Sequence, residues 1–139
     1  MASTDWVAIS QEEQSRGIVN QIRREISSSP YYGSTRDITM IDVYMAAAAL
    51  AIQKNIKPTH EYKRETDMTA KNYITDNMQW FMCMLFYHFD PDKDLSKLDD
   101  KALIVRTFEQ YAQAGLPYLL DMCKSRNSMD EFKRAIDKG

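Results

Sequence analysis

Residues 40–54 read Met-Ile-Asp-Val-Tyr-Met-Ala-Ala-Ala-Ala-Leu-Ala-Ile-Gln-Lys, and this segment decides the fold class. Its alanine run combines the highest helix propensity with a small cross-section, so it predicts a helix that another helix can approach closely. Thr39 and Asp42 have the spacing of an N-terminal cap. Asn55 stands where a left-handed C-terminal residue is expected, and Pro58 follows it. These signals together predict a helix over about 40–54.

Helical patterns continue on the N-terminal side of this segment. Ser10 and Glu13 have capping-box spacing, and apolar residues then recur at helical intervals, which predicts a first helix over about 10–27. Pro30 lies beyond its end, where a helix cannot continue.

A third helix is predicted from Thr69 or Thr75 to Phe89. Its residues 78–87 are apolar on nearly every side, which is typical of the central, buried helix of a bundle. No segment of the sequence shows sustained strand alternation. We therefore expect an all-α fold.

The last third of the chain predicts three shorter helices. Core-spaced apolar residues predict one over about 101–113, Gly115 is expected to end it, and Pro117 suits the first turn of the next. Ser128 and Glu131 have capping-box spacing and predict a terminal helix. The expected architecture is a compact bundle of five or six helices.

Composition favours one globular domain over residues 1–139. The chain is 44% hydrophobic and 27% charged, with only 4 Gly and 4 Pro. The first ten residues lack the basic and apolar regions of a signal peptide, and the longest apolar stretch, 43–52, is far short of the roughly 20 residues of a membrane span. We expect a cytoplasmic protein without membrane contact.

No motif in the sequence carries a recognisable catalytic or metal-binding chemistry. There is no nucleophile elbow and no glycine-rich phosphate loop. The segment 90–94 alternates aspartates as a calcium loop does, but Leu95 and Lys101 stand where such a loop needs Gly and Glu. The few zinc-type ligands do not have convergent spacing: Cys83, Cys123, His60 and His88. We expect no enzyme activity, no metal and no cofactor.

A basic segment with interleaved tyrosines lies between the second and third predicted helices. Residues 57–71 lack a clear period and predict a surface connector. Two interpretations stay open, because the segment suits either an ordinary solvated connector or a nucleic-acid surface on which Tyr62 and Tyr73 stack against bases. Against the second, the whole chain carries a net charge of −2. The candidate nucleic-acid-binding residues are Lys54, Lys57, Lys63, Arg64 and Lys71.

Methionines and aromatic residues suggest both core and interface. The sequence has 9 methionines, and a methionine-rich face can either fill core gaps or adapt to a partner. Those in apolar helical stretches are Met78, Met82, Met84 and Met122. Aromatic residues near the ends of the first predicted helix are candidate interface anchors: Trp6, Tyr31 and Tyr32.

Two stretches, residues 40–58 and Phe108-Glu-Gln-Tyr-Ala-Gln-Ala-Gly-Leu116, carry a family resemblance. Together they resemble small helical accessory proteins encoded beside DNA-phosphorothioation (Dnd-type) and related anti-phage defence genes. The order and spacing of the parts match over residues 37–136, whereas residues 1–36 have no counterpart. The second stretch departs from the family element, with Gln110, Gln113 and Ala114 in place of Glu, Asn and Gly, and the basic stretch before Pro58 is weaker.

The resemblance implies a helical subunit of a defence system and supplies no mechanism. Our first hypothesis is a non-enzymatic subunit or adaptor that holds a larger nuclease, helicase or ATPase partner. We expect its contacts in the connector and around the predicted helix break: Lys63, Arg64, Tyr111, Gly115 and Leu116. The alternatives are a nucleic-acid-binding module, either a small ribonucleoprotein subunit or a DNA-binding regulator, and a phage-encoded inhibitor of such a system.

Overall fold

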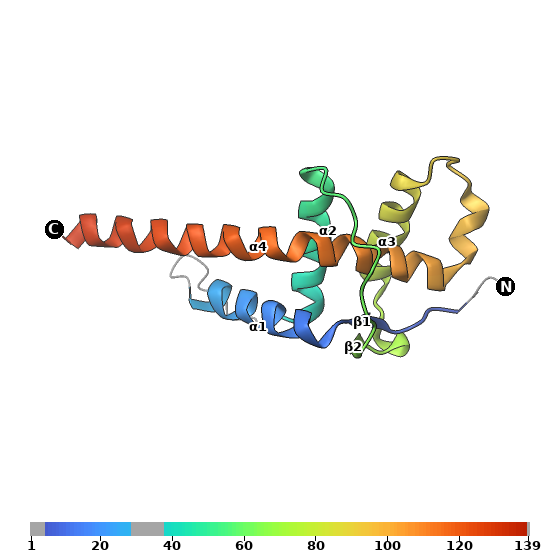
Figure 1. Ribbon diagram of the computed structural model, residues 1–139, viewed down its shortest axis with the longest axis horizontal. Coiled ribbons are helices and arrows are strands. Elements are labelled where there is room, and N and C mark those ends of the chain that lie inside the picture. Colours follow the sequence, from blue (N-terminus) through green and yellow to red (C-terminus); the bar gives the residue numbers. More distant parts are fainter. Residues whose placement is uncertain (1–4, 29–37, 139) are drawn as a thin grey trace.

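The computed structural model describes the backbone of residues 5–28 and 38–138 and the side chains of 5–26 and 38–125. This part of the chain is mostly helical (Figure 1). Its elements are β1 (Ile9–Gln11), α1 (Glu13–Ser28), α2 (Met40–Gln53), β2 (Thr66–Thr69), the 3₁₀ helix η1 (Lys71–Tyr73), α3 (Asp76–Phe89), the 3₁₀ helix η2 (Leu95–Asp99) and α4 (Lys101–Lys138). The expected helical class is confirmed, but these ranges hold four α-helices rather than five or six.

Helix α4 is the element against which the other three α-helices of the described residues pack. It extends along the long axis in Figure 1, and α1, α2 and α3 each pack against it. The core lies where these helices meet. Tyr44 of α2 packs edge-on against Phe108 of α4, with ring centroids 5.9 Å apart, and both side chains are fully buried.

Helices α2 and α4 cross at very short range. A methyl group at Gly115 would lie 1.9 Å from the carbonyl oxygen of Ala47, so only glycine fits at this position of α4. Ala47 and Ala48 are fully buried at the crossing. The prediction that another helix can approach the alanine run closely is therefore confirmed, and that helix is α4.

The predicted break near Gly115 is wrong. The backbone stays helical through Gly115 and Pro117, and Ser128 lies inside the same helix rather than at the start of another. Glycine and proline disfavour a helix interior by about 1 and 3 kcal/mol. Burial of Leu116 against the core offsets this cost, and Pro117 faces solvent, where water can bind the carbonyl that the proline ring leaves without a donor.

The chain before α1 forms a strand instead of a helical cap. Ser10 belongs to β1, which pairs antiparallel with β2, so α1 begins at Glu13 and not at Ser10. The hydroxyl of Ser10 donates to Asp67 at 2.6 Å. The connector therefore contains a strand that sequence alternation did not indicate, since each strand has only three or four residues.

The predicted ends of α2 are confirmed. The Thr39 hydroxyl accepts from the Asp42 amide at 3.2 Å, and the Asp42 carboxylate accepts from the Thr39 amide at 3.1 Å. At the other end Asn55 has a φ of 56°, and the amide of Ile56 donates to Ala51 at 2.8 Å. This geometry is a Schellman motif, which satisfies the last carbonyls of the helix.

Candidate protein-binding face

The outer side of α3 carries two large, exposed apolar side chains. Trp80 is 69% exposed and Met84 is 58% exposed, one helical turn apart. The expectation that α3 is the central, buried helix is therefore wrong. Only Met82, Leu85 and Phe86 of this helix are buried, so Trp80 and Met84 face solvent, together with the polar residues Asp76, Asn77 and His88. Exposed contiguous apolar surface on a small domain marks an interaction site.

A hollow of about 510 Å³ lies between α2 and α3. Five of its lining residues come from one face of α3, at positions 80, 81, 84, 85 and 88, and Ile52 closes it from the last turn of α2. Phe81 and Leu85 form its inner part, because Phe81 stacks edge-on against core residue Phe108 and Leu85 is 3% exposed. We call this hollow, with Trp80 and Met84 at its rim, the α3 groove.

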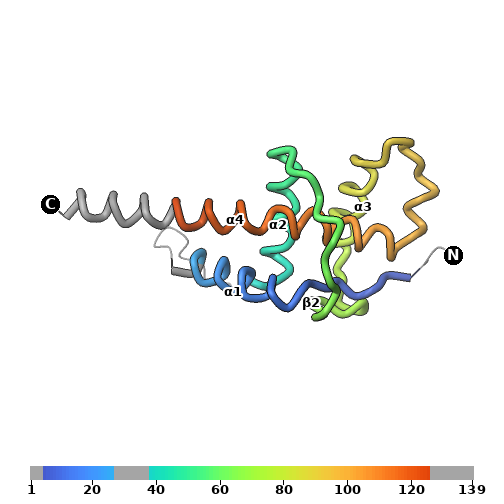
Figure 2. The backbone as a smooth tube through the Cα atoms, viewed as in Figure 1, coloured from blue at the N-terminus to red at the C-terminus, as the bar shows by residue number. Residues whose placement is uncertain are grey.

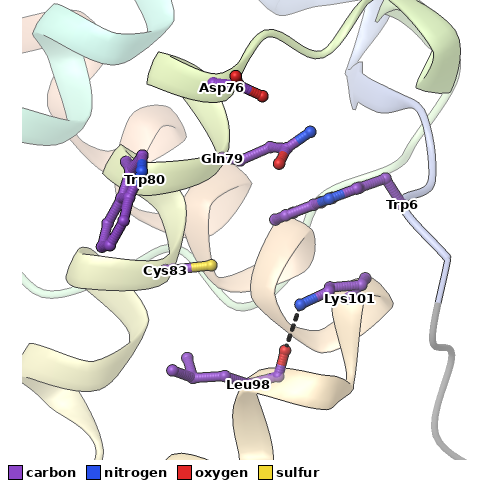
Figure 3. Close-up of a pocket in the computed structure, with 7 residues that line it drawn as sticks. All are labelled: Trp6, Asp76, Gln79, Trp80, Cys83, Leu98 and Lys101. Atoms are coloured by element: carbon purple, nitrogen blue, oxygen red, sulfur yellow. Dashed lines mark hydrogen bonds between the residues drawn. The ribbon is translucent and has the colours of Figure 1, made fainter.

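A second hollow, of about 310 Å³, lies on the other side of Trp80 (Figure 3). Its α3 side is lined by Asp76, Gln79, Trp80 and Cys83. The opposite side is lined by Trp6, Leu98 and Lys101. We call it the Trp6 pocket. Burial raises the pKa of the Cys83 thiol, while the nearby Lys101 acts in the opposite direction, so this thiol is neutral at pH 7.

Three of the predicted contact residues lie inside the fold and do not form a surface. Tyr111 is 8% exposed and stacks on Phe89 with ring centroids 4.4 Å apart, and Leu116 is 1% exposed. Gly115 faces the backbone of Ala47. The expectation that these residues are exposed is therefore wrong, and partner contact at them stays a prediction. They are buried because the helix break that would have exposed them does not occur.

Arg64, the fourth predicted contact, is bound to a buried carboxylate. Its Nε donates to Glu109 Oε1 at 2.9 Å, and its Nη2 donates to Glu109 Oε2 at 3.2 Å. The same carboxylate accepts from the Tyr62 hydroxyl at 2.6 Å and the Ser10 amide at 2.7 Å. Burial and this hydrogen bond raise the pKa of Tyr62 above its usual range. Arg64 therefore joins the connector to α4, and Lys63 beside it is exposed.

The other predicted nucleic-acid contacts are exposed but spread out. Lys54 and Lys57 follow α2, whereas Lys71 follows β2. In Figure 2 the chain between these elements crosses α4 from one side of the molecule to the other. The Tyr62 hydroxyl is bound to Glu109, and Tyr73 is 76% exposed. Lys54 and Lys57 therefore lie at one end of the connector and Lys71 at the other.

The described residues contain neither a cluster of metal ligands nor a membrane-spanning helix. Within residues 5–26 and 38–125, no group of three or more His, Cys, Asp or Glu residues lies close enough together to hold a metal ion. No helix within the described residues is long and apolar enough to cross a bilayer. Tyr31 and Tyr32, two of the candidate anchors, lie outside the described residues, and Trp6 lines the pocket named after it.

Sequence reasoning missed Trp80 as a surface residue and left Met84 open between the core and a partner surface. A helix that is apolar on all sides predicts burial when it is taken alone, and the same pattern arises when one face packs on the core and the other awaits a partner. The available signal was that α3 begins and ends in charged segments and that the alanine-rich α2 is a better central helix.

Comparisons with family models, with curated proteins and with solved structures found no match to this chain. We therefore infer function from the geometry of the α3 groove, the Trp6 pocket and the connector.

Proposed function

We propose that this protein is a non-enzymatic helical adaptor that binds an amphipathic helix of a larger partner protein in the α3 groove. The observation that carries the proposal is the exposed pair Trp80 and Met84 beside an apolar hollow of about 510 Å³. Tryptophan is among the residues that contribute most to binding energy at protein interfaces, and methionine adapts to varied partner surfaces.

The shape of the groove favours a helix as its occupant. Its wall is one face of α3, with residues 80, 84 and 88 on successive turns and Ile52 opposite. A groove that follows a helix axis accepts apolar side chains spaced at i, i+3/i+4 and i+7 on a second helix. The resemblance to defence-system accessory proteins supports a larger nuclease, helicase or ATPase subunit as the source of that helix.

The test compares two double variants of the full chain. Trp80→Ser with Met84→Ser removes the groove rim, and Tyr118→Ser with Met122→Ser removes two side chains on α4 that are each 50% exposed. Tagged proteins are recovered from the organism that encodes them, with and without nuclease, and a photo-crosslinking residue at position 84 identifies the bound segment. We expect a stoichiometric, nuclease-resistant protein partner whose recovery falls at least tenfold in the groove variant alone.

Three outcomes would contradict the proposal. In the first outcome, the groove variant still recovers the partner. In the second, the partner disappears after nuclease treatment, and this loss would favour the nucleic-acid-binding alternative. The wild-type chain could also form a homodimer that the groove variant dissociates, so that the occupant is a second copy. Thermal melting of both variants confirms that the fold is intact, as expected for exposed side chains.

A further inference from the structure

We propose that the Trp6 pocket is a separate binding site for a ligand that joins one apolar, ring-sized group to a single carboxylate. Its volume of about 310 Å³ falls within the range of roughly 300–1,000 Å³ that small-molecule pockets occupy. The pocket shares only Trp80 with the α3 groove, so the proposal does not depend on the partner helix.

The residues of the pocket walls favour a flat apolar ring as one part of the ligand. The indole of Trp6 lies opposite α3, and Cys83 and Leu98 complete the lining between them (Figure 3). The thiol of Cys83 is neutral and behaves as a small apolar group. A flat ring can therefore lie against the indole of Trp6 with apolar atoms on its other side.

The charge of the ligand follows from Lys101. The indole of Trp6 alone would suit a cation, because tryptophan rings attract positive charge. That position is already occupied, since Lys101 Nζ lies 5.1 Å from the ring centroid of Trp6. Nζ also donates to the Leu98 carbonyl oxygen at 2.6 Å, which holds the ammonium in place at the pocket. An ammonium has three N–H donors, so it can also bind an incoming carboxylate.

Asp76 limits the ligand to one carboxylate. It lines the end of the pocket opposite Lys101 (Figure 3), where a second negative group would be repelled. Gln79 lines the pocket beside it, and its side-chain nitrogen donates to the Ile74 carbonyl oxygen at 3.3 Å. The expected ligand class is therefore an apolar monocarboxylate, either a free small acid or the terminal residue of a protein chain.

The probes are 3-phenylpropanoate and its uncharged isostere 3-phenylpropanamide, each titrated into the full chain. The readout is the pair of indole N–H signals in an NMR spectrum, because the chain has only 2 Trp. We expect the acid to shift the Trp6 signal and to bind about tenfold more tightly than the amide, the factor that a charge-assisted hydrogen bond supplies. Lys101→Met should reduce the acid to the affinity of the amide, whereas Lys101→Arg should keep part of the preference.

Two control variants test whether the preference for the acid depends on Lys101 alone. Lys57→Met removes an exposed lysine elsewhere and Met84→Ser alters only the α3 groove, so both should keep the preference for the acid. Equal binding of acid and amide, binding of neither, or a preference that survives Lys101→Met would overturn the proposal. A peptide ending in phenylalanine with a free carboxylate distinguishes the sources, since tighter binding than that of 3-phenylpropanoate assigns the site to a protein C-terminus and weaker binding assigns it to a small acid.

Discussion

Glu109 of α4 holds two other segments, β1 and the connector. Its side chain is 0% exposed and binds Ser10 of β1 together with Tyr62 and Arg64 of the connector. A buried carboxylate is costly unless each of its oxygens has donors. Each of the two Glu109 carboxylate oxygens accepts two hydrogen bonds, so the buried charge is satisfied and the connector is held on α4.

Glu109→Gln should lower the free energy of unfolding by about 3 kcal/mol, measured by urea denaturation. Breaking a buried ion pair costs about 3–5 kcal/mol, and the lower end applies because the Arg64 side chain is 35% exposed. The amide would also direct its own N–H groups at donors. Glu65→Gln, at an exposed carboxylate, is the matched control and should change stability by less than about 0.5 kcal/mol. Equal effects of the two changes would refute this role.

Asp90 makes stability depend on pH. Hydrogen bonds from the Asp94 amide at 2.9 Å and from Lys97 Nζ at 2.9 Å lower the pKa of its carboxyl below the ordinary value. A lowered native pKa contributes stability above the ordinary pKa, and this contribution is lost as the pH falls through the native pKa. Asp90→Asn should therefore lower the melting temperature by several degrees at pH 7. The difference from wild type should disappear in strong acid, and a constant difference across melts at both pH values would exclude this origin.

At the scale of elements, the crossing of α2 and α4 determines the path of α4. Gly115 and Ala47 bring the two helices together so closely that no side chain fits between them. The hydroxyl of Tyr44 accepts a hydrogen bond from the Gln113 side chain at the same crossing. Glycine is used here for close approach, and its position inside a helix follows from packing and not from backbone flexibility.

Two glycine-to-alanine changes should have opposite effects. Gly115→Ala would place a methyl group 1.9 Å from the Ala47 carbonyl oxygen and should cost about 3 kcal/mol of unfolding free energy. Gly17→Ala, in α1 with no atom within 4 Å of the added methyl group, should stabilise by about 0.5–1 kcal/mol. Thermal and urea denaturation of both variants provides the measurement. A neutral Gly115→Ala would show that the helices do not cross at this distance.

At the scale of the whole molecule, the basic connector is attached to the body. The Lys63 amide donates to Glu12 at 2.8 Å, and the Thr66 hydroxyl donates to Glu13 at 3.0 Å, in addition to the Arg64–Glu109 pair. The connector thus has a structural task that accounts for part of its charge. The apolar face of α3, in contrast, has no such internal role in the part of the chain that the structure describes.

Partner binding should depend little on salt. Between about 50 and 200 mM salt, we expect the dissociation constant to change by less than about threefold, because apolar burial in the α3 groove supplies most of the affinity. A surface that neutralises about four phosphates would instead lose roughly a hundredfold over the same range. Isothermal titration of the purified partner at both concentrations makes the comparison, and a steep decline would favour the nucleic-acid-binding alternative.

Local signals were sufficient for much of the helical framework. The box at Thr39 and Asp42 and the left-handed Asn55 each depend on residues within a few positions, so the sequence alone determined where α2 begins and ends. It left the start of α3 open between Thr69 and Thr75, and the structure has the cap at Thr75. The helical class follows from the same kind of short-range pattern.

The tertiary structure alone decided the placement of Ser10, Gly115 and Trp80. Ser10 lies in a strand because it pairs with Asp67 of β2, a residue 57 positions away. Gly115 stays inside α4 because Ala47 packs against it. Trp80 is on the surface because α2, rather than α3, occupies the main crossing with α4. In each case a long-range contact decides the outcome, and a local sequence pattern does not indicate which distant residue will pack against it.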